Sequence, residues 1–118
     1  MDKQTVDALC RKQMGSTHDY QVDWEADRYH IGGKMFAMLG ADSKGVSILT
    51  LKCDPARADE LREIYEGIVP GYHMNKTHWN SVAVDGLKRD LIFKLIDHSY
   101  DLVFKSLTKK VQSTINNS

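Results

Sequence analysis

One stretch of this sequence, residues 69–82, is rich in side chains that can bind a partner by hydrogen bonding or stacking. It contains two of the chain's five histidines and one of its two tryptophans, and it has no acidic residue. Imidazole, amide and ammonium groups form hydrogen bonds, and an indole ring offers a flat surface on which another ring can stack. Loops that carry such groups are typical places for binding residues. The candidate binding residues in this stretch are Tyr72, His73, Asn75, Lys76, His78 and Trp79.

Each of these residues also has a structural interpretation, which the sequence leaves open. His73 and His78 lie five positions apart with no Cys, Asp or Glu in the stretch, so a zinc site lacks both ligands and spacing. They either tie the loop to backbone carbonyls or contact a ligand. Trp79 either packs in the core or offers a stacking platform for a base. Asn75 bonds its own backbone, as in many turns, or contacts the ligand, and Lys76 is simply solvated or engages an anion.

Patterns of catalytic and cofactor-binding sites are absent from the sequence. No nucleophile elbow and no acid pair suited to general acid and base catalysis stand out. Gly32-Gly33 lacks the spacing and the Gly-Lys-Ser/Thr ending of a phosphate loop. We therefore expect a non-enzymatic protein that uses no cofactor and no metal ion.

The charge balance argues against a strong nucleic-acid binder driven by a basic field. The chain has 16 Lys and Arg against 16 Asp and Glu, whereas such a domain is usually clearly basic. Residues 1–66 carry 9 basic and 12 acidic groups, and residues 67–118 carry 7 and 4. This asymmetry favours a dipolar molecule.

The remaining composition indicates a globular protein of the cytoplasm. At 118 residues the chain has the size of a single domain, residues 1–118. No run of residues is long and apolar enough for a membrane helix, and no signal peptide is evident. The two cysteines, Cys10 and Cys53, lie far apart and are expected to be reduced and buried.

The elements that must position the candidate loop follow from apolar spacing and turn residues. Residues 2–14 predict a short helix, and the polar residues 16–23 are interpreted as a connection. Three strands are predicted at residues 24–31, 34–39 and 46–51, with Gly32-Gly33 as a hairpin turn.

A second helix is predicted to start at Asp54-Pro55, because Asp can accept from the first free N–H groups and Pro lacks an N–H at that position. Its buried stripe is predicted to be Ala58, Leu61, Ile64, Tyr65 and Ile68. A strand is predicted at residues 79–84, and apolar spacing from Leu91 to Leu107 predicts the last helix. Residues 112–118 are polar and are expected to fray.

The order is therefore helix, three strands, helix, one or two strands, helix. This order predicts an α+β fold in which an antiparallel sheet has its helices packed on one face.

Several segments of the sequence resemble the YjbR/MmcQ family. They are Gly33-Lys34-Met35-Phe36-Ala37, Leu51-Lys52-Cys53-Asp54-Pro55, Pro70-Gly71-Tyr72-His73-Met74-Asn75-Lys76-Thr77-His78-Trp79, Asp85-Gly86 and Leu95-Ile96-Asp97-His98-Ser99-Tyr100. The resemblance covers nearly the whole chain. It implies a compact α+β domain related in shape to secretion-chaperone folds, described as a double-wing arrangement and commonly labelled as predicted DNA-binding. Leu87-Lys88-Arg89 departs from the family pattern and makes this turn more basic.

Two hypotheses about function follow. In the first, the protein binds DNA weakly and in a salt-dependent way, with Lys76, Lys88, Arg89 and either Lys34 or Lys44 on phosphates. His73, Asn75 and His78 would add hydrogen bonds. In the second, the sheet or the loop docks a protein or peptide segment, and nucleic acid plays no part. The zero net charge favours the second hypothesis mildly.

Overall fold

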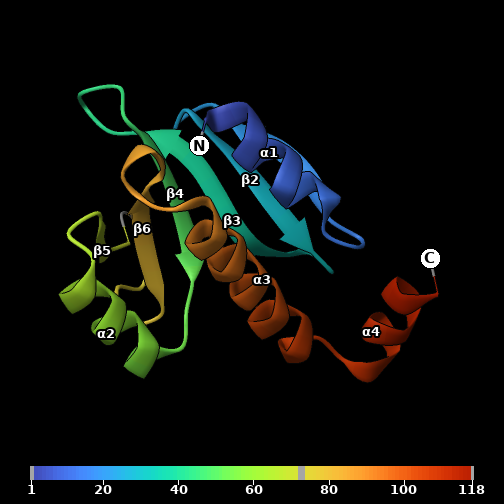
Figure 1. The fold of residues 1–118 in the computed structure, drawn as a ribbon. Helices are drawn as coiled ribbons and strands as arrows, with labels where there is room; N and C mark the ends of the chain where they lie inside the picture. Colours follow the sequence, from blue (N-terminus) through green and yellow to red (C-terminus); the bar gives the residue numbers. More distant parts are fainter. Residues whose placement is uncertain (1, 72–73, 118) are drawn as a thin grey trace.

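The computed structural model describes residues 2–71 and 74–117, which form a six-stranded antiparallel sheet with helices on one side (Figure 1). The strand order is β1-β2-β3-β4-β6-β5. The elements are α1 (Lys3–Lys12), β1 (Thr17–Gln21), β2 (Ala26–Ile31), β3 (Lys34–Ala41), β4 (Ser47–Lys52), α2 (Pro55–Ile64), β5 (Ile68–Pro70), β6 (Trp79–Ala83), the 3₁₀ turn η1 (Val84–Gly86), α3 (Arg89–Ser106) and α4 (Lys109–Asn116). The predicted α+β fold class and antiparallel sheet are confirmed.

Turn and capping residues act where the sequence predicts them. The Asp54 carboxylate accepts from the Arg57 N–H at 3.4 Å and caps α2, which begins at Pro55. Gly32 and Gly33 join β2 to β3 with φ angles of 58° and 83°, in the left-handed region that favours glycine. A Cβ at Gly32 would also lie 2.7 Å from Leu107 Cδ1, so packing as well as backbone conformation requires glycine there.

The connection predicted at residues 16–23 is wrong, because part of it forms the edge strand β1. Polar pairs across the strands hold β1 to β2: Arg28 donates two hydrogen bonds to Asp19, at 2.8 and 2.6 Å. His18 Nε2 lies 2.7 Å from Asp27 Oδ1. A strand held by such pairs lacks the apolar alternation by which strands are recognised in a sequence.

The frayed end predicted for residues 112–118 is also wrong over most of its length, because the chain continues into α4. The Thr108 hydroxyl accepts from the Val111 N–H at 3.2 Å and caps this helix. Ile115 is buried, and Val111 packs against the core. Two apolar residues four positions apart are too few to establish a helical pattern in the sequence. Figure 1 shows α4 beyond the end of α3, outside the span of the sheet.

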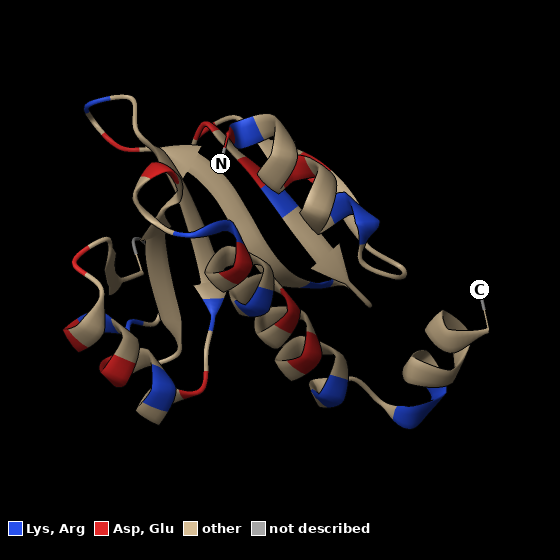
Figure 2. Cartoon of the chain, in the orientation of Figure 1, with Lys and Arg blue, Asp and Glu red and all other residues tan. Residues whose placement is uncertain are grey.

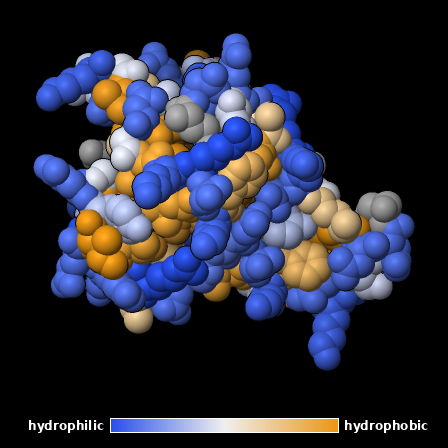
Figure 3. Space-filling view, in the orientation of Figure 1, coloured by the Kyte–Doolittle hydropathy of each residue, from blue (hydrophilic) through white to orange (hydrophobic). Residues whose placement is uncertain are grey.

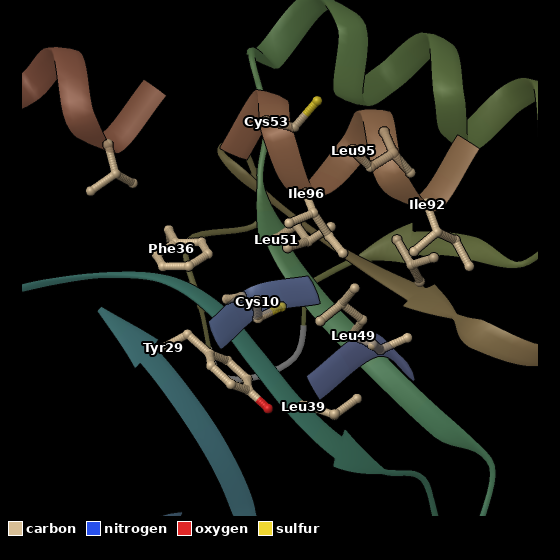
Figure 4. Packing of buried hydrophobic residues seen from close by; sticks show 14 of the residues in the cluster. Cys10, Tyr29, Phe36, Leu39, Leu49, Leu51, Cys53, Ile92, Leu95 and Ile96 are labelled. Carbon is tan, nitrogen blue, oxygen red and sulfur yellow. The ribbon is translucent and has the colours of Figure 1, made fainter. Parts of the chain in front are cut away.

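The core lies between the sheet and helices α1 and α3 (Figure 4). Tyr29 and Phe36 from the strands are fully buried and pack together with rings 6.5 Å apart. Ile92 and Ile96 project from α3 toward the strand residues in the same view. Cys10 and Cys53 are both buried and unpaired in the part of the chain that the structure describes.

A β-bulge at Phe36 connects the sheet to α3. The register between β2 and β3 pairs Tyr29 with Ala37 but His30 with Met35, so Phe36 is the extra residue. The fully buried Ser99 of α3 donates its hydroxyl to the Phe36 carbonyl at 2.6 Å. The same oxygen accepts from the Lys52 N–H at 2.9 Å, so one side chain joins α3 to both β3 and β4.

The predicted stripe of α2 is correct for Ala58 and Leu61, which are buried, but wrong for Ile64, which is 60% exposed. The helix ends at Ile64, and the next residue, Tyr65, has an extended backbone. The chain then turns into β5, so Ile68 reaches the core from a strand instead of the helix.

The two faces of the sheet differ in what covers them. Along β4 and β6, Leu49, Leu51, Asn80 and Val82 alternate with Ile48, Thr50, Lys52, Trp79, Ser81 and Ala83. The first set lies on the side of α2 and α3. The second set lies on the opposite side, which carries no helix of the described chain, and we call it the helix-free face.

Candidate functional site

The candidate loop joins β5 to β6, and its described part is built around Asn75. The Asn75 side-chain oxygen accepts from the Thr77 N–H at 2.9 Å. Its main-chain carbonyl accepts from the N–H groups of His78 and Trp79, at 3.1 and 3.0 Å. Asn75 therefore bonds its own neighbouring backbone, which was one of its two interpretations. Tyr72 and His73 lie outside the described residues.

Main-chain bonds fix both sides of this loop to the sheet. The Gly71 N–H donates to the Trp79 carbonyl at 2.8 Å, which extends the pairing of β5 with β6. The Cys53 N–H donates to the His78 carbonyl at 2.8 Å, directly after β4. A Cβ at Gly71 would lie 2.8 Å from Trp79 Cβ, so glycine is required for this close approach.

Arg62 of α2 anchors the loop from the helix side. Its guanidinium donates to the main-chain carbonyls of Lys76 and Trp79, the latter at 3.2 Å. It also donates to the side-chain oxygen of Asn80 at 2.6 Å and to Asp59 at 3.2 Å. Only 19% of the Arg62 side chain is exposed. The planar fork of arginine suits several acceptors at once, so Arg62 sets the shape of the loop.

The loop's main chain is held in this way while its polar side chains point outward. Lys76, Thr77 and His78 are exposed, and Trp79 is half-buried. Trp79 lies on the helix-free face and not in the helix-side core, directly opposite Lys52 of β4. Side chains paired in this way across antiparallel strands are in contact range. We call Lys52, Lys76, His78 and Trp79 the contact surface.

The basic residues proposed to act together are divided between the two ends of the sheet. Lys76 precedes β6, whereas Lys88 and Arg89 follow β6 and η1 and are exposed at the start of α3. Lys44 lies in the β3–β4 loop, also at that second end. Lys34 lies at the same end as Lys52, but its ammonium reaches toward Ser106 at the end of α3, 3.4 Å from the hydroxyl. The structure therefore places Lys52 and Lys76 at the same end of the sheet, and Lys88 and Arg89 at the other end.

Sequence reasoning missed Arg62, Asn80 and Lys52. Arg62 and Lys52 look like ordinary charged residues on a helix and a strand, and although Lys52 lies in a segment that resembles the family, no pattern assigns either residue a role. Asn80 is buried and also donates to the Ala58 carbonyl at 3.5 Å. An Asn within a strand pattern does not by itself indicate such a buried structural role. Only the alternation of β4, combined with the pairing of β4 and β6, would have placed Lys52 beside Trp79.

His98 of α3 supports the chain segment to which the loop is attached. Its Nε2 accepts from the Asp54 N–H at 3.2 Å, next to Cys53. Partial burial of the ring, together with the nearby Arg57 guanidinium, holds the pKa of His98 below its usual value. An imidazolium could not accept this hydrogen bond, so the folded protein favours the neutral ring.

Acidification from about pH 8 to about pH 5 is therefore expected to lower the stability of the fold through His98. The unfolded chain binds the proton more readily than the folded one. The stabilisation is thus complete above the unfolded pKa and is lost as the pH falls toward the lower folded pKa. Urea midpoints at several pH values would measure it. His98→Gln keeps an oxygen acceptor that does not titrate, so its midpoint should fall less; an equal fall in both proteins would contradict the assignment. Burial also lowers the pKa of His30. This histidine is present in both proteins, so its contribution to the pH dependence is common to the two curves.

Two further classes of site find no support within residues 2–71 and 74–117. No group of three or more His, Cys, Asp or Glu residues is placed to hold a metal ion. No described helix has the length and apolar character needed to cross a bilayer.

Comparison with known proteins gives consistent matches. A family model described as YjbR matches residues 11–102. The chain is 36% identical to the Escherichia coli O157:H7 protein YbdF over 98% of each chain. It is 32% identical to YjbR of Escherichia coli K12 over 77% of each. Both relatives are described as uncharacterized proteins.

Solved structures match the fold as well. The crystal structure of Deinococcus radiodurans protein DR2400, described with the family domain DUF419, superposes with a TM-score of 0.86 at 31% identity. That match covers 96% of this chain and 86% of the other. A crystal structure of a Pseudomonas syringae protein gives a TM-score of 0.75 at 27% identity, covering 87% of this chain and 99% of the other.

Proposed function

This chain belongs to the YjbR family, and we propose that it is a non-enzymatic binding domain that contacts DNA weakly through the contact surface. We further propose that it works in the cytoplasm, where its two unpaired cysteines would remain reduced. The observation that carries the DNA proposal is the pairing of a half-buried Trp79 with Lys52 on the helix-free face, with the exposed Lys76 and His78 directly before Trp79 in the chain.

Such a surface offers the two kinds of contact that bind nucleic acid without strong sequence preference. Ammonium groups of Lys52 and Lys76 can neutralise phosphates, and the indole of Trp79 offers a face for a base. The hydrogen bonds from Arg62, Gly71 and Cys53 to the loop carbonyls hold the main chain in place. Binding then costs little ordering of the protein, which favours even a small contact.

The surrounding charges make the expected binding weak. Figure 2 shows basic and acidic residues interspersed on the helices instead of gathered into one basic field. The Asp59 carboxylate also forms an ion pair with the Arg62 guanidinium, with a nitrogen–oxygen distance of 3.2 Å, and so partly offsets its positive charge. Two lysines on phosphates predict a slope of log affinity against log salt of about −1.4 for single strands and about −1.8 for duplex. If Lys88 and Arg89 joined them, the slope for single strands would be about −2.8.

We expect Lys76→Gln to weaken DNA binding and to make the salt slope shallower by about 0.7 to 0.9. The test is fluorescence anisotropy of labelled single-stranded and duplex oligonucleotides at several salt concentrations. Lys44→Gln is a matched control, because Lys44 is also an exposed loop lysine but lies at the other end of the sheet. It should leave the curves unchanged.

Two outcomes would overturn the proposal. One is no anisotropy change at about 20 mM salt with protein at about 100 μM, where even nonspecific binding is detectable. The other is an equal loss of affinity in Lys44→Gln and Lys76→Gln, because it would mean that the charge of the protein matters and the contact surface does not.

The second candidate, a protein- or peptide-binding domain, is favoured by exposed apolar residues near the same edge. Ile64 at the end of α2 is 60% exposed and Val69 of the edge strand β5 is 37% exposed. Figure 3 shows hydrophobic side chains between α2 and α3 on the helix side. The crevice beneath them holds only about 10 Å³, so it would not admit a side chain. A peptide would therefore have to add to the β5 edge, and an oligonucleotide titration without binding would leave this function as the one to test.

A further inference from the structure

A hollow of the helix-free face lies toward the opposite end of the sheet from the contact surface. It has a volume of about 360 Å³ and is lined by Trp24, Ala26, Met38, Gly40, Ala41, Asp42, Ser43, Ile48 and Thr50. This volume is within the range of small-molecule sites. The strand pairings place Ala26 and Ile48 on either side of Gly40, and the loops around Trp24 and Asp42 form the rim.

The floor of this hollow is apolar with one hydroxyl pair. Ala26 and Met38 are buried, at 2% and 7% exposure. Gly40 has no side chain to fill the space above it, and a Cβ there would meet only Ala26 Cβ at 3.5 Å and the Glu25 carbonyl at 3.8 Å. The Thr50 hydroxyl, 3.0 Å from that of Ser81, is the polar group at the floor. The absence of a side chain at Gly40 is thus what keeps the hollow open.

The rim combines an aromatic face with acidic groups. Trp24 is 45% exposed, and the Arg28 guanidinium lies 6.0 Å from its ring centre. Asp42 holds its own loop by accepting from the N–H groups of Lys44 and Val46, at 2.8 and 3.0 Å.

Acidic residues outnumber the basic ones around this rim. Asp42 lines the hollow, and Asp23 and Glu25, which do not line it, are the exposed neighbours of Trp24 in the turn between β1 and β2. Of the two nearby cations, Arg28 is bound to Asp19 and Lys44 is exposed beside Asp42. The field at the mouth therefore favours a positively charged ligand.

From this we infer that the hollow is a binding site for a small organic cation with an apolar or aromatic body. The apolar part would lie on Met38, Ile48 and Ala26, and the cationic group would lie between the Trp24 indole and the Asp42 carboxylate. An indole face attracts a cation through its quadrupole, and a carboxylate adds a direct charge interaction. This site does not depend on the DNA proposal, because the two share no residue.

Titration with benzyltrimethylammonium chloride, followed by amide and indole chemical shifts of the ¹⁵N-labelled protein, tests the inference. Benzyl alcohol and phenylacetate are the matched neutral and anionic probes. We expect saturable shifts at Trp24, Gly40 and Thr50. The cation should bind most tightly, benzyl alcohol less tightly, and phenylacetate most weakly. Trp24→Ala should weaken binding of the cation by about threefold to tenfold.

Two further variants separate the ring and the charge from general effects. Asp42→Asn keeps the side-chain oxygen that accepts from the N–H groups of Lys44 and Val46. It should weaken binding of the cation by about twofold to fivefold and leave the affinity for benzyl alcohol unchanged. Tyr20→Ala removes another exposed aromatic residue, 52% exposed, that does not line the hollow, and it should have no effect. The inference is overturned if no shift saturates, if phenylacetate binds as tightly as the cation, or if Tyr20→Ala and Trp24→Ala weaken binding equally.

Discussion

Replacing Arg62 with alanine is expected to lower the free energy of unfolding by about 2 to 4 kcal/mol and to release the loop before β6 from its fixed shape. The substitution removes hydrogen bonds to Asn80 and to the carbonyls of Lys76 and Trp79. Asn80 is 3% exposed, so its side-chain oxygen would lose a charged donor in a place that water reaches poorly. Urea denaturation followed by far-UV circular dichroism measures the loss.

Arg57→Ala is the matched control, since Arg57 is a partly buried arginine on the same helix whose side chain makes no comparable set of contacts with the residues that the structure describes. It should change the stability by less than about 1 kcal/mol. Arg62→Lys should recover only part of the loss, because one ammonium cannot reproduce the planar fork that reaches Asn80 and the loop carbonyls together. An Arg62→Ala protein as stable as the Arg57→Ala protein would show that Arg62 is not the anchor.

Ser99→Ala is expected to cost about 2 to 3 kcal/mol, which is large for the loss of one oxygen atom. The hydroxyl donates to the Phe36 carbonyl at 2.6 Å and accepts from the Lys52 N–H at 2.9 Å. Phe36 is the bulged residue of β3, so it has no paired residue in the register between β2 and β3. Alanine would leave both backbone groups without this partner, the Phe36 carbonyl in a fully buried place and the Lys52 N–H in a partly buried one.

Thermal and urea unfolding of Ser99→Ala and Ser106→Ala would test this assignment. Ser106 is on the same helix but exposed, and its hydroxyl donates to the Val103 carbonyl within that helix. Its loss should cost less than about 0.5 kcal/mol. If the two variants were equally stable, Ser99 would be a small packing residue and no link between α3, β3 and β4.

The parts of the fold that were predictable from sequence are those with local signals. Apolar spacing establishes α3, and Asp54-Pro55 and Gly32-Gly33 place a cap and a hairpin because their backbone chemistry permits little else. Strand β1 and helix α4 were missed because their stability comes from contacts with distant residues, such as Arg28 with Asp19 and Ile115 with the core.

The candidate site follows the same division. The composition of the loop made Lys76 and His78 candidate binding residues and left their exposure open, and the structure has both on the surface. Whether other cations join them depends on strand order, since Lys52 reaches Trp79 only through the pairing of β4 with β6. The same pairing carries Lys88 and Arg89 to the far end of β6. Distance along the chain is therefore a poor guide to neighbours in space. Lys52 is 27 residues from Trp79 in the sequence but is paired with it across β4 and β6, whereas Lys88 is only 9 residues from Trp79 in the sequence but lies at the other end of β6.

Amide chemical-shift mapping with a short single-stranded oligonucleotide at low salt tests the proposed contact surface most directly. We expect the largest changes at Lys52 and across residues 74–79, including the Trp79 indole, with Lys44, Lys88 and Arg89 unaffected. These changes should diminish as salt is added, because phosphate contacts release counterions. Changes centred on Lys88 and Arg89, or no change near Trp79 at any salt concentration, would contradict the account.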